Sequence, residues 1–296
     1  MSANTGITTV IASAGTSERH ASLMRAIDSI LDQEGVDAAP LVVLNGPNVS
    51  EDVVRELEQR GIATARLERG SLPHALHYGR QQVTTPFFSF LDDDDLYLPD
   101  TLHLRLQPLL DENHIDVVVA NGFVERDGEK HVLLPDSLDL SEAPLEKLFA
   151  RNWLASCGGL YRTATVSADY IREDARYFEW TMTAFLLGLD RRMHFIANKT
   201  FVVQDSPVSL SKSIEYAEAC PGILKKMLAY DLPAPIVRTL KRKIAAAYHD
   251  ASVKNLELGH RGKAWRYHLA SLSGWSGLRY LSYTIRLFLP RFGSAD

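Results

Sequence analysis

Two hydrophobic patterns alternate along the first hundred residues. Short runs of consecutive apolar or β-branched residues indicate buried strands, and they occupy residues 7–13, 40–46, 62–67 and 86–91. Between them, apolar residues recur every three or four positions, which predicts amphipathic helices at residues 20–33, 51–60 and 72–82. Apolar strands that alternate with such helices are typical of a mostly parallel sheet covered on both faces. We therefore predict a Rossmann-like α/β fold.

The pattern is less regular after residue 100. It predicts helices at residues 100–113, 141–150 and 179–189, and strands at residues 115–125, 130–134, 157–162 and 199–203. Local signals support two boundaries: Ser50 is a suitable N-cap for the second helix, and Asp127-Gly128 is a hairpin turn sequence. From residue 211 onward the chain is predicted to be helical.

The composition is that of a globular protein with one large or two small domains, with 296 residues of which 46% are hydrophobic. Two cysteines cannot form a disulfide framework, so we expect a reducing compartment. The N-terminal residues lack the pattern of a secretory signal, and no run approaches the roughly 20 apolar residues of a spanning helix. We expect a cytoplasmic protein, with no nucleic acid among its partners.

Four consecutive aspartates, residues 92–95, follow the fourth predicted strand without a break. In an open α/β sheet, ligands bind at the carboxyl ends of the strands. Ser13 and Asn45 stand at the carboxyl ends of two other predicted strands, so we expect these side chains to share one crevice with the aspartates. Most acidic runs are solvated loops, but the apolar residues on both sides of this one favour a functional site.

A hard divalent cation would relieve the repulsion among these carboxylates. Mg²⁺ and Mn²⁺ prefer oxygen ligands, and Mg²⁺ commonly uses one or two protein carboxylates together with substrate phosphates. If the strand continues beyond Leu91, Asp92 and Asp94 point to one side and Asp93 to the other. We therefore expect Mn²⁺ or Mg²⁺ at Asp92 and Asp94, with Asp94 as the first candidate for a direct ligand.

The segment FFSFLDDDDLYLPDTL (87–102) resembles the D-x-D segment of family 2 glycosyltransferases with the GT-A fold. Four further segments are similar to other motifs of that family and stand in the family's order: ITTVIASAGTSERHASLMRAIDSILDQ (7–33), LVVLNGPN (41–48), ERGSLPHALHYGR (68–80) and YFEWTMTAFLLGLD (177–190). Each motif alone is a weak signal, whereas the ordered set is a strong one.

The resemblance implies a metal-dependent, inverting transfer of a sugar from a nucleotide-diphosphate sugar to a hydroxyl acceptor, in the synthesis of a cell-surface polysaccharide or glycolipid. It implies that Asp94, with Asp92, holds the cation that stabilises the leaving diphosphate, and that Asp92 or Asp93 reaches the ribose. Glu179 stands where the family has the acid before Trp, at the start of a predicted helix. It is implied as the general base that takes the acceptor's proton, and a helix N-terminus favours its ionised form.

Other residues enter the site through the same resemblance. Ser13 and Asn45 are expected to bind the donor, although Asn45 replaces an acid that the family usually carries there. His77 lies on the helix where the family often places Arg and Asn near the donor phosphates. Trp153 and Trp180 are candidates for an acceptor-stacking platform, with core packing as the alternative for both.

Two acids rival Glu179 as the base. The family's usual pair is Glu-Asp, and Glu173 and Asp174 stand shortly before Glu179 in REDARYFEW (172–180). The resemblance also divides the chain into a catalytic domain, residues 1–211, with a nucleotide-sugar-binding half (about 1–98) and an acceptor-binding half (about 99–211).

The remaining residues, 212–296, form a predicted basic helical segment. The net charge of the chain is −5, yet residues 238–296 carry eleven Lys and Arg against three Asp and Glu. Apolar residues cluster on one side of a helical wheel drawn for this segment, which is typical of a helix that lies on anionic lipid; packing on the catalytic domain is the alternative. Contact through residues 260–292 would place the enzyme peripherally at the inner membrane face, near a glycan or lipid-linked acceptor.

Two other functions are compatible with parts of the pattern. A sugar-phosphate nucleotidyltransferase also uses a parallel α/β sheet and a divalent metal, but it ordinarily has a Gly-rich loop with a basic residue after the first strand. SAGTSERH (13–20) offers one glycine and Arg19. A catalytically silent nucleotide-sugar-binding scaffold is favoured by the altered residues Asn45 and Ser206.

Overall fold

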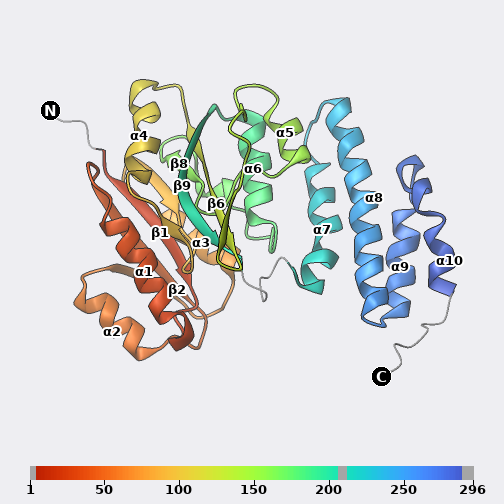
Figure 1. Cartoon of the computed structure of the whole chain (residues 1–296), viewed down its shortest axis with the longest axis horizontal. Coiled ribbons are helices and arrows are strands. Elements are labelled where there is room, and N and C mark those ends of the chain that lie inside the picture. Colours follow the sequence, from red (N-terminus) through yellow and green to blue (C-terminus); the bar gives the residue numbers. More distant parts are fainter. Residues whose placement is uncertain (1–4, 206–211, 289–296) are drawn as a thin grey trace. The chain divides into compact units, whose positions relative to one another are not determined.

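The computed structural model describes residues 5–205 and 212–288. The chain divides into two compact units, Met1–Ser206 and Pro207–Asp296, whose elements are labelled in Figure 1. The first unit contains a sheet with flanking helices, and the second is helical. The sequence places this division between residues 211 and 212; residues 206–211 lie outside the described part of the chain.

One nine-stranded sheet runs through the first unit in the order β3-β2-β1-β4-β8-β6-β9-β5, with β7 paired to β6. Its strands are β1 (Ile7–Ser13), β2 (Ala38–Asn45), β3 (Ala63–Leu67), β4 (Phe87–Phe90), β5 (Leu96–Tyr97), β6 (Val117–Arg126), β7 (Glu129–Val132), β8 (Gly159–Arg162) and β9 (Met193–Gln204). Strand β1 pairs in parallel with β2 and β4, and β2 pairs in parallel with β3. Strands β6 and β9 also pair in parallel, whereas β8 runs antiparallel to both β4 and β6. The predicted α/β class is confirmed.

Helices cover both faces of this sheet (Figure 1). They are α1 (His20–Leu31), α2 (Glu51–Gln59), α3 (Leu72–Gln82), α4 (Thr101–Asp111), α5 (Pro144–Ala150) and α6 (Glu179–Asp190), with the short 3-10 helices η1 (Ser17–Arg19) and η2 (Ala168–Tyr170). Ile7 and Ile11 of β1 join the core cluster that contains Ile27 of α1. Val10 points to the opposite face, where a Cβ added to Gly79 of α3 would lie 2.4 Å from Val10 Cγ1. Glycine therefore allows α3 to pack closely on β1.

Several predicted boundaries are confirmed at the residue level. The Ser50 side chain accepts a hydrogen bond from the backbone N–H of Asp52 and caps α2. Asp127 and Gly128 both have positive φ, 53° and 81°, and close the antiparallel hairpin of β6 and β7. The two-residue strand β5 was not predicted, because two residues are too few to show a period.

The second unit consists of α7 (Ile214–Met227), α8 (Ala234–Glu257), α9 (Arg261–Ser271), the 3-10 helix η4 (Trp275–Tyr280) and α10 (Tyr283–Phe288). Its core contains apolar residues of α8 and α9, and Ser252 of α8 donates a hydrogen bond of 2.7 Å to the carbonyl of Ala264. The predicted helical character is confirmed for residues 212–288. Within that range and residues 5–205, every helix is too short or too polar to cross a bilayer.

Candidate active site

The four aspartates at residues 92–95, here called the acid turn, do not continue strand β4. The strand ends at Phe90, and the backbone N–H of Asp95 donates to the carbonyl of Asp92 at 3.1 Å, which closes a turn. The expectation of a continued strand is therefore wrong. Burial nevertheless alternates, since Asp93 and Asp95 are buried while Asp92 and Asp94 are partly exposed. Asp92 and Asp94 are thus both partly exposed, and a turn rather than a continued strand sets this alternation; their pairing as cation ligands stays a prediction.

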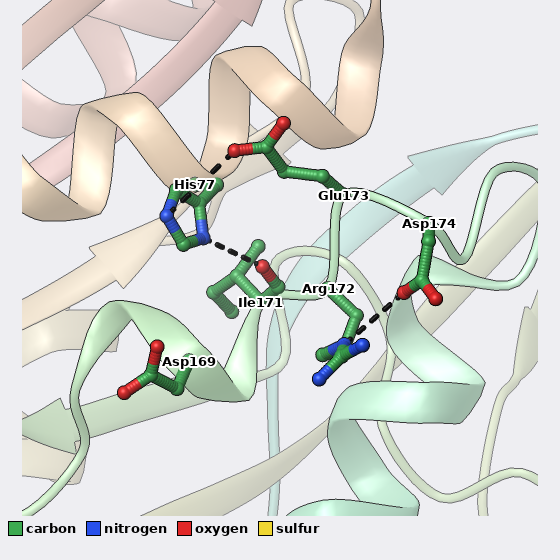
Figure 2. A pocket seen from close by; sticks show the side chains of 6 residues that line it. All are labelled: His77, Asp169, Ile171, Arg172, Glu173 and Asp174. Atoms are coloured by element: carbon green, nitrogen blue, oxygen red, sulfur yellow. Dashed lines mark hydrogen bonds and ion pairs between the residues drawn. The ribbon is translucent and has the colours of Figure 1, made fainter.

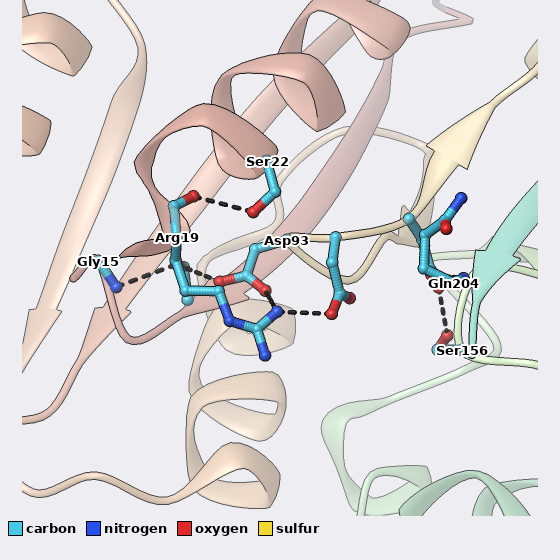
Figure 3. A network of polar contacts seen from close by, with 9 residues as sticks. Gly15, Arg19, Ser22, Asp93, Ser156 and Gln204 are labelled. Carbon is cyan, nitrogen blue, oxygen red and sulfur yellow. Dashed lines mark hydrogen bonds and ion pairs between the residues drawn. The ribbon is translucent and has the colours of Figure 1, made fainter. Parts of the chain in front are cut away.

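Asp93 fastens the acid turn to the end of β1. Its carboxylate accepts a hydrogen bond of 2.5 Å from Ser13 Oγ and one of 3.0 Å from Arg19 Nη1 (Figure 3). Ser13 Oγ in turn accepts from the backbone N–H of Gly15 at 3.0 Å. Burial raises the pKa of Asp93, and the Ser13 hydroxyl and the Arg19 charge offset that rise in part. In this structure the Ser13 hydroxyl thus supports the acid turn.

Asp95 fastens the other side of the acid turn. Its carboxylate accepts from the backbone N–H of Gln204 at 3.0 Å and from Ser156 Oγ at 3.3 Å, and Cys157 Sγ lies 3.6 Å away. Ser156 and Gln204 lie on the far side of the turn from Arg19 in Figure 3. Burial, followed by the charge of Asp92, raises the pKa of Asp95 well above its usual range. Asp95 is a structural acid that ties the turn to the end of β9.

Asp92 and Asp94 remain as the candidate cation ligands. Burial raises the pKa of Asp92 to about 7, and the charges of Asp94, Asp93 and Glu179 add to that rise. Asp94 is 39% exposed and forms an ion pair of 2.5 Å with Arg19. The described residues contain no ready-made cluster of three or more His, Cys, Asp or Glu ligands. The pair still fits Mg²⁺ or Mn²⁺, because such ions use one or two carboxylates beside substrate phosphates and would relieve the repulsion that raises the pKa of Asp92.

Glu179 begins α6 immediately beside the acid turn. The ring of Trp180, the next residue, packs edge-on against Phe90 at the end of β4, with centroids 5.2 Å apart. Glu179 is 6% exposed, and its Oε1 accepts from the backbone N–H of Tyr177 at 3.0 Å. Tyr177 has a φ of 74°, a left-handed conformation that costs a non-glycine residue about 1–3 kcal/mol and is often found at functional sites.

The ionisation of Glu179 differs from the expectation based on helix position. Backbone N–H groups of Glu179 and Tyr177 favour its charged form, but burial outweighs them and raises the pKa of Glu179. A carboxylate with a raised pKa binds a proton more readily, which suits a general base.

The rival acids Glu173 and Asp174 line a different feature, a cavity of about 330 Å³ (Figure 2). Its lining residues are His77, Asp169, Ile171, Arg172, Glu173 and Asp174. Glu173 is 48% exposed and pairs with His74 at 2.9 Å, and Asp174 pairs with Arg172 at 3.1 Å. Among these three acids, Glu179 alone is buried and contributes to the raised pKa of Asp92.

Two predicted donor-binding residues make contacts within the protein. Asn45 Oδ1 accepts from the backbone N–H of Ser71, which precedes α3, at 2.7 Å. His77 Nδ1 donates to the carbonyl of Ile171 at 2.9 Å, and Figure 2 shows its ring directed at the loop of Ile171 and Glu173. The structure therefore places His77 in the cavity of Figure 2, and no hydrogen bond or ion pair joins it to the acid turn.

The two tryptophans occupy different environments. Trp153 is 1% exposed, and its indole N–H donates to the carbonyl of Pro144 at 3.0 Å. No face of its ring is available to a sugar in this structure, so core packing describes Trp153 better than an acceptor platform does. Trp180 is partly exposed and adjoins Glu179, which leaves it as the candidate for acceptor contact.

An α/β sheet of this topology, with an acid turn at the end of β4 and a buried glutamate beside it, defines a glycosyltransferase of the GT-A fold. The sequence model of glycosyl transferase family 2 matches residues 16–165, half of the chain, and the chain belongs to this family.

Similar proteins agree with this assignment. An uncharacterized glycosyltransferase of Rickettsia typhi is 31% identical over 222 residues, which cover 71% of this chain and 70% of the relative. One of Rickettsia prowazekii is 24% identical over 69% of this chain and 68% of its own length. Among solved structures, residues 1–349 of S. aureus TarS in complex with UDP-GlcNAc align with a TM-score of 0.63 at 15% identity, over 90% of this chain and 81% of that one. The structural likeness shows a shared fold.

Proposed function

We propose that this glycosyltransferase transfers a sugar from a nucleotide-diphosphate sugar to a hydroxyl acceptor, with inversion at the sugar. The observation that carries the proposal is the position of Glu179 beside the acid turn, where its charge contributes to the raised pKa of Asp92 and where Trp180 packs on Phe90. A proton acceptor and a pair of candidate cation ligands thus occupy one site, as a displacement at the sugar carbon requires.

Each residue has a separate task in this proposal. Asp94, with Asp92, holds a divalent cation, which when bound stabilises the charge that develops on the leaving diphosphate. Asp93 and Asp95 keep the acid turn in place through Ser13 and Gln204. Glu179 accepts the proton of the attacking hydroxyl. The buried site around it limits water, which would otherwise compete as an acceptor.

A thermal-shift panel of nucleoside diphosphates and nucleotide sugars tests the proposal, with Mn²⁺ or Mg²⁺ and then with EDTA. UDP-GlcNAc is the first donor to include, because the TarS structure contains it. We expect one nucleotide to raise Tm in the presence of metal, loss of that rise on chelation, and its loss in Asp94→Ala. No shift with any nucleotide would contradict the proposal, and binding with no release of sugar would favour a silent scaffold.

We further propose that the second unit contacts an anionic membrane surface, which would bring the enzyme to a glycan or lipid-linked acceptor at the inner membrane face. Five apolar side chains of η4, α10 and their junction are 46–92% exposed and recur every three or four residues: Trp275, Leu278, Leu281, Ile285 and Phe288. Arg279 and Arg286, both exposed, border this apolar face. Basic residues beside an exposed apolar stripe match anionic lipid; residues 289–292 of the predicted segment lie outside the described part.

Flotation with phosphatidylglycerol and with phosphatidylcholine vesicles tests the membrane contact. Wild-type protein should float with the anionic vesicles, and the double substitution Trp275→Ser and Ile285→Ser should reduce that fraction severalfold. Leu31→Ser is the matched control, because Leu31 is 50% exposed on α1 of the first unit. Equal flotation of wild type and the double variant would reject the contact.

A further inference from the structure

Arg19 joins two aspartates of the acid turn through a single nitrogen. Its Nη1 lies 3.0 Å from Asp93 and 2.5 Å from Asp94, and Figure 3 shows the guanidinium beside the carboxylate of Asp93. Nε and Nη2 take no part in these ion pairs, and the side chain is 46% exposed. The guanidinium thus has donors left over on the solvent side of the site.

The two ion pairs of Arg19 differ in how firmly they are held. The Asp93 side chain is 11% exposed and is also bound by Ser13 at 2.5 Å. The Asp94 side chain is 39% exposed. Within residues 5–205 and 212–288, Arg19 is the cation that forms ion pairs with the acid turn. Arg19 is therefore anchored at Asp93 and exchangeable at Asp94.

We propose that Arg19 is an exchangeable counter-ion: it competes with the divalent cation for Asp94 and, once displaced, binds the diphosphate of the donor. This inference rests on the proposed function and assigns a residue of this chain to the diphosphate. A guanidinium matches phosphate oxygens through two parallel N–H donors, and Nε and Nη2 are the pair left over. Because Asp93 anchors Nη1, the displaced side chain stays beside the site that the diphosphate would enter.

Arg19 supplies the positive charge that the two histidines of α3 do not bring to the acid turn. The helix α3 presents His74 and His77, and both pair with Glu173 of the neighbouring loop, at 2.9 and 3.8 Å. These imidazoles thus interact with a carboxylate away from the acid turn. Arg19 supplies from the start of α1 a positive charge that the acid turn otherwise lacks among the described residues.

The test compares wild type with Arg19→Ala in two binding titrations. Mn²⁺ alone, followed by its electron paramagnetic resonance signal, should bind Arg19→Ala about two- to fivefold more tightly, the range expected for removing a competing exposed ion pair. At saturating Mn²⁺, the nucleoside diphosphate selected by the thermal-shift panel should bind Arg19→Ala about tenfold more weakly, which corresponds to one lost charge-assisted contact. Arg19→Lys should lie between the two proteins for the nucleotide.

The matched control is Arg60→Ala, since Arg60 forms comparable ion pairs with Asp28 and Glu56, both at 2.7 Å, on the surface of the same unit. It should leave both titrations unchanged. If Arg19→Ala changes neither titration, or weakens Mn²⁺ binding, Arg19 is a structural ion pair and the inference is wrong. If the wild type binds neither Mn²⁺ nor any nucleotide, the proposed function fails as well, which distinguishes the two failures.

Discussion

Carboxylates with raised pKa values lie both in the acid turn and at the start of α6, where Glu179 is the one concerned, but the causes differ. At Asp92 the like charges of Asp94, Asp93 and Glu179 add to the effect of burial. At Glu179 burial is the main cause, and it acts against the favourable backbone N–H donors and the charge of Arg176. A bound cation removes the repulsion among like charges, whereas a bound proton removes the free-energy cost of burying a single charge. The first region therefore suits metal binding, and the second suits proton transfer.

Glu179→Gln should produce the largest effect and separates the two regions most directly. Glutamine keeps the size and the acceptor oxygen for Tyr177 but cannot take a proton. We expect kcat to fall by about 10²–10⁴, the usual contribution of general base catalysis, while the metal-dependent nucleotide thermal shift is retained. Glu173→Gln is the control and should keep full activity. If the Glu179→Gln enzyme is active, Glu179 is not the general base and another acid is.

The pH dependence of kcat sharpens the assignment of Glu179. A base acts in its ionised form, so activity is lost as the pH falls through its pKa. Because burial raises the pKa of Glu179, the acid limb of the rate profile should lie above the usual range of a glutamate, about 4.3. A limb at or below that range would show that the base is an exposed acid.

The sequence predicted the first half of the fold better than the contacts within the site. Strands β1 to β4 and helices α1 to α3 were placed within about two residues, because their apolar residues follow one clear period. The acid turn was found because four charges follow a buried strand. Its partners Arg19 and Gln204 lie 74 and 109 residues away from the aspartates that they contact. No local pattern reports such distances.

The roles within the acid turn were also only partly predictable. We expected a continued strand to point the four side chains alternately to its two sides. A turn instead gives them alternating burial. Asp95 was not selected as a site residue, since nothing in the run DDDD distinguishes one aspartate from the next. Its structural role follows from Gln204 and Ser156, which the fold brings to it. Trp153 was misjudged for a similar reason: residue type alone does not separate a core tryptophan from a binding one.

Asp95→Ala should produce the next largest effect. It tests whether Asp95 stabilises the acid turn while Asp94 serves as a cation ligand. Removing the carboxylate deletes its hydrogen bonds to the backbone N–H of Gln204 and to Ser156 Oγ, which contribute about 0.5–1.5 kcal/mol each. A unit of this size should lose about 2–4 °C in Tm for each kcal/mol. Asp94→Ala, at the exposed neighbouring position, should change stability by less than about 1 kcal/mol. Equal losses in the two variants would refute the division.

Asp92→Asn should produce the smallest effect, a change in how stability depends on pH. In the folded protein the pKa of Asp92 is raised from 3.8 to about 7, so the folded state binds this proton more tightly than the unfolded chain does. Its stabilising contribution is complete below pH 4 and is lost as the pH rises towards 7. A rise of that size corresponds to roughly 4 kcal/mol, which solvent screening at the partly exposed Asp92 reduces to about 1 kcal/mol. Asparagine does not ionise, so in EDTA the variant should unfold about 2–4 °C higher than wild type at pH 8, and at the same temperature at pH 4.

The matched control for that measurement is Asp111→Asn, an exposed acid at the end of α4, which should give parallel curves with the wild type at every pH. Added Mn²⁺ should reverse the order at pH 8, because the ion stabilises the wild-type acid turn and has one ligand fewer in Asp92→Asn. If the variant is no more stable than wild type at pH 8 in EDTA, ionised Asp92 does not raise the free energy of the folded acid turn, whether through burial or through repulsion. The contrast with Glu179 would then lose its physical basis.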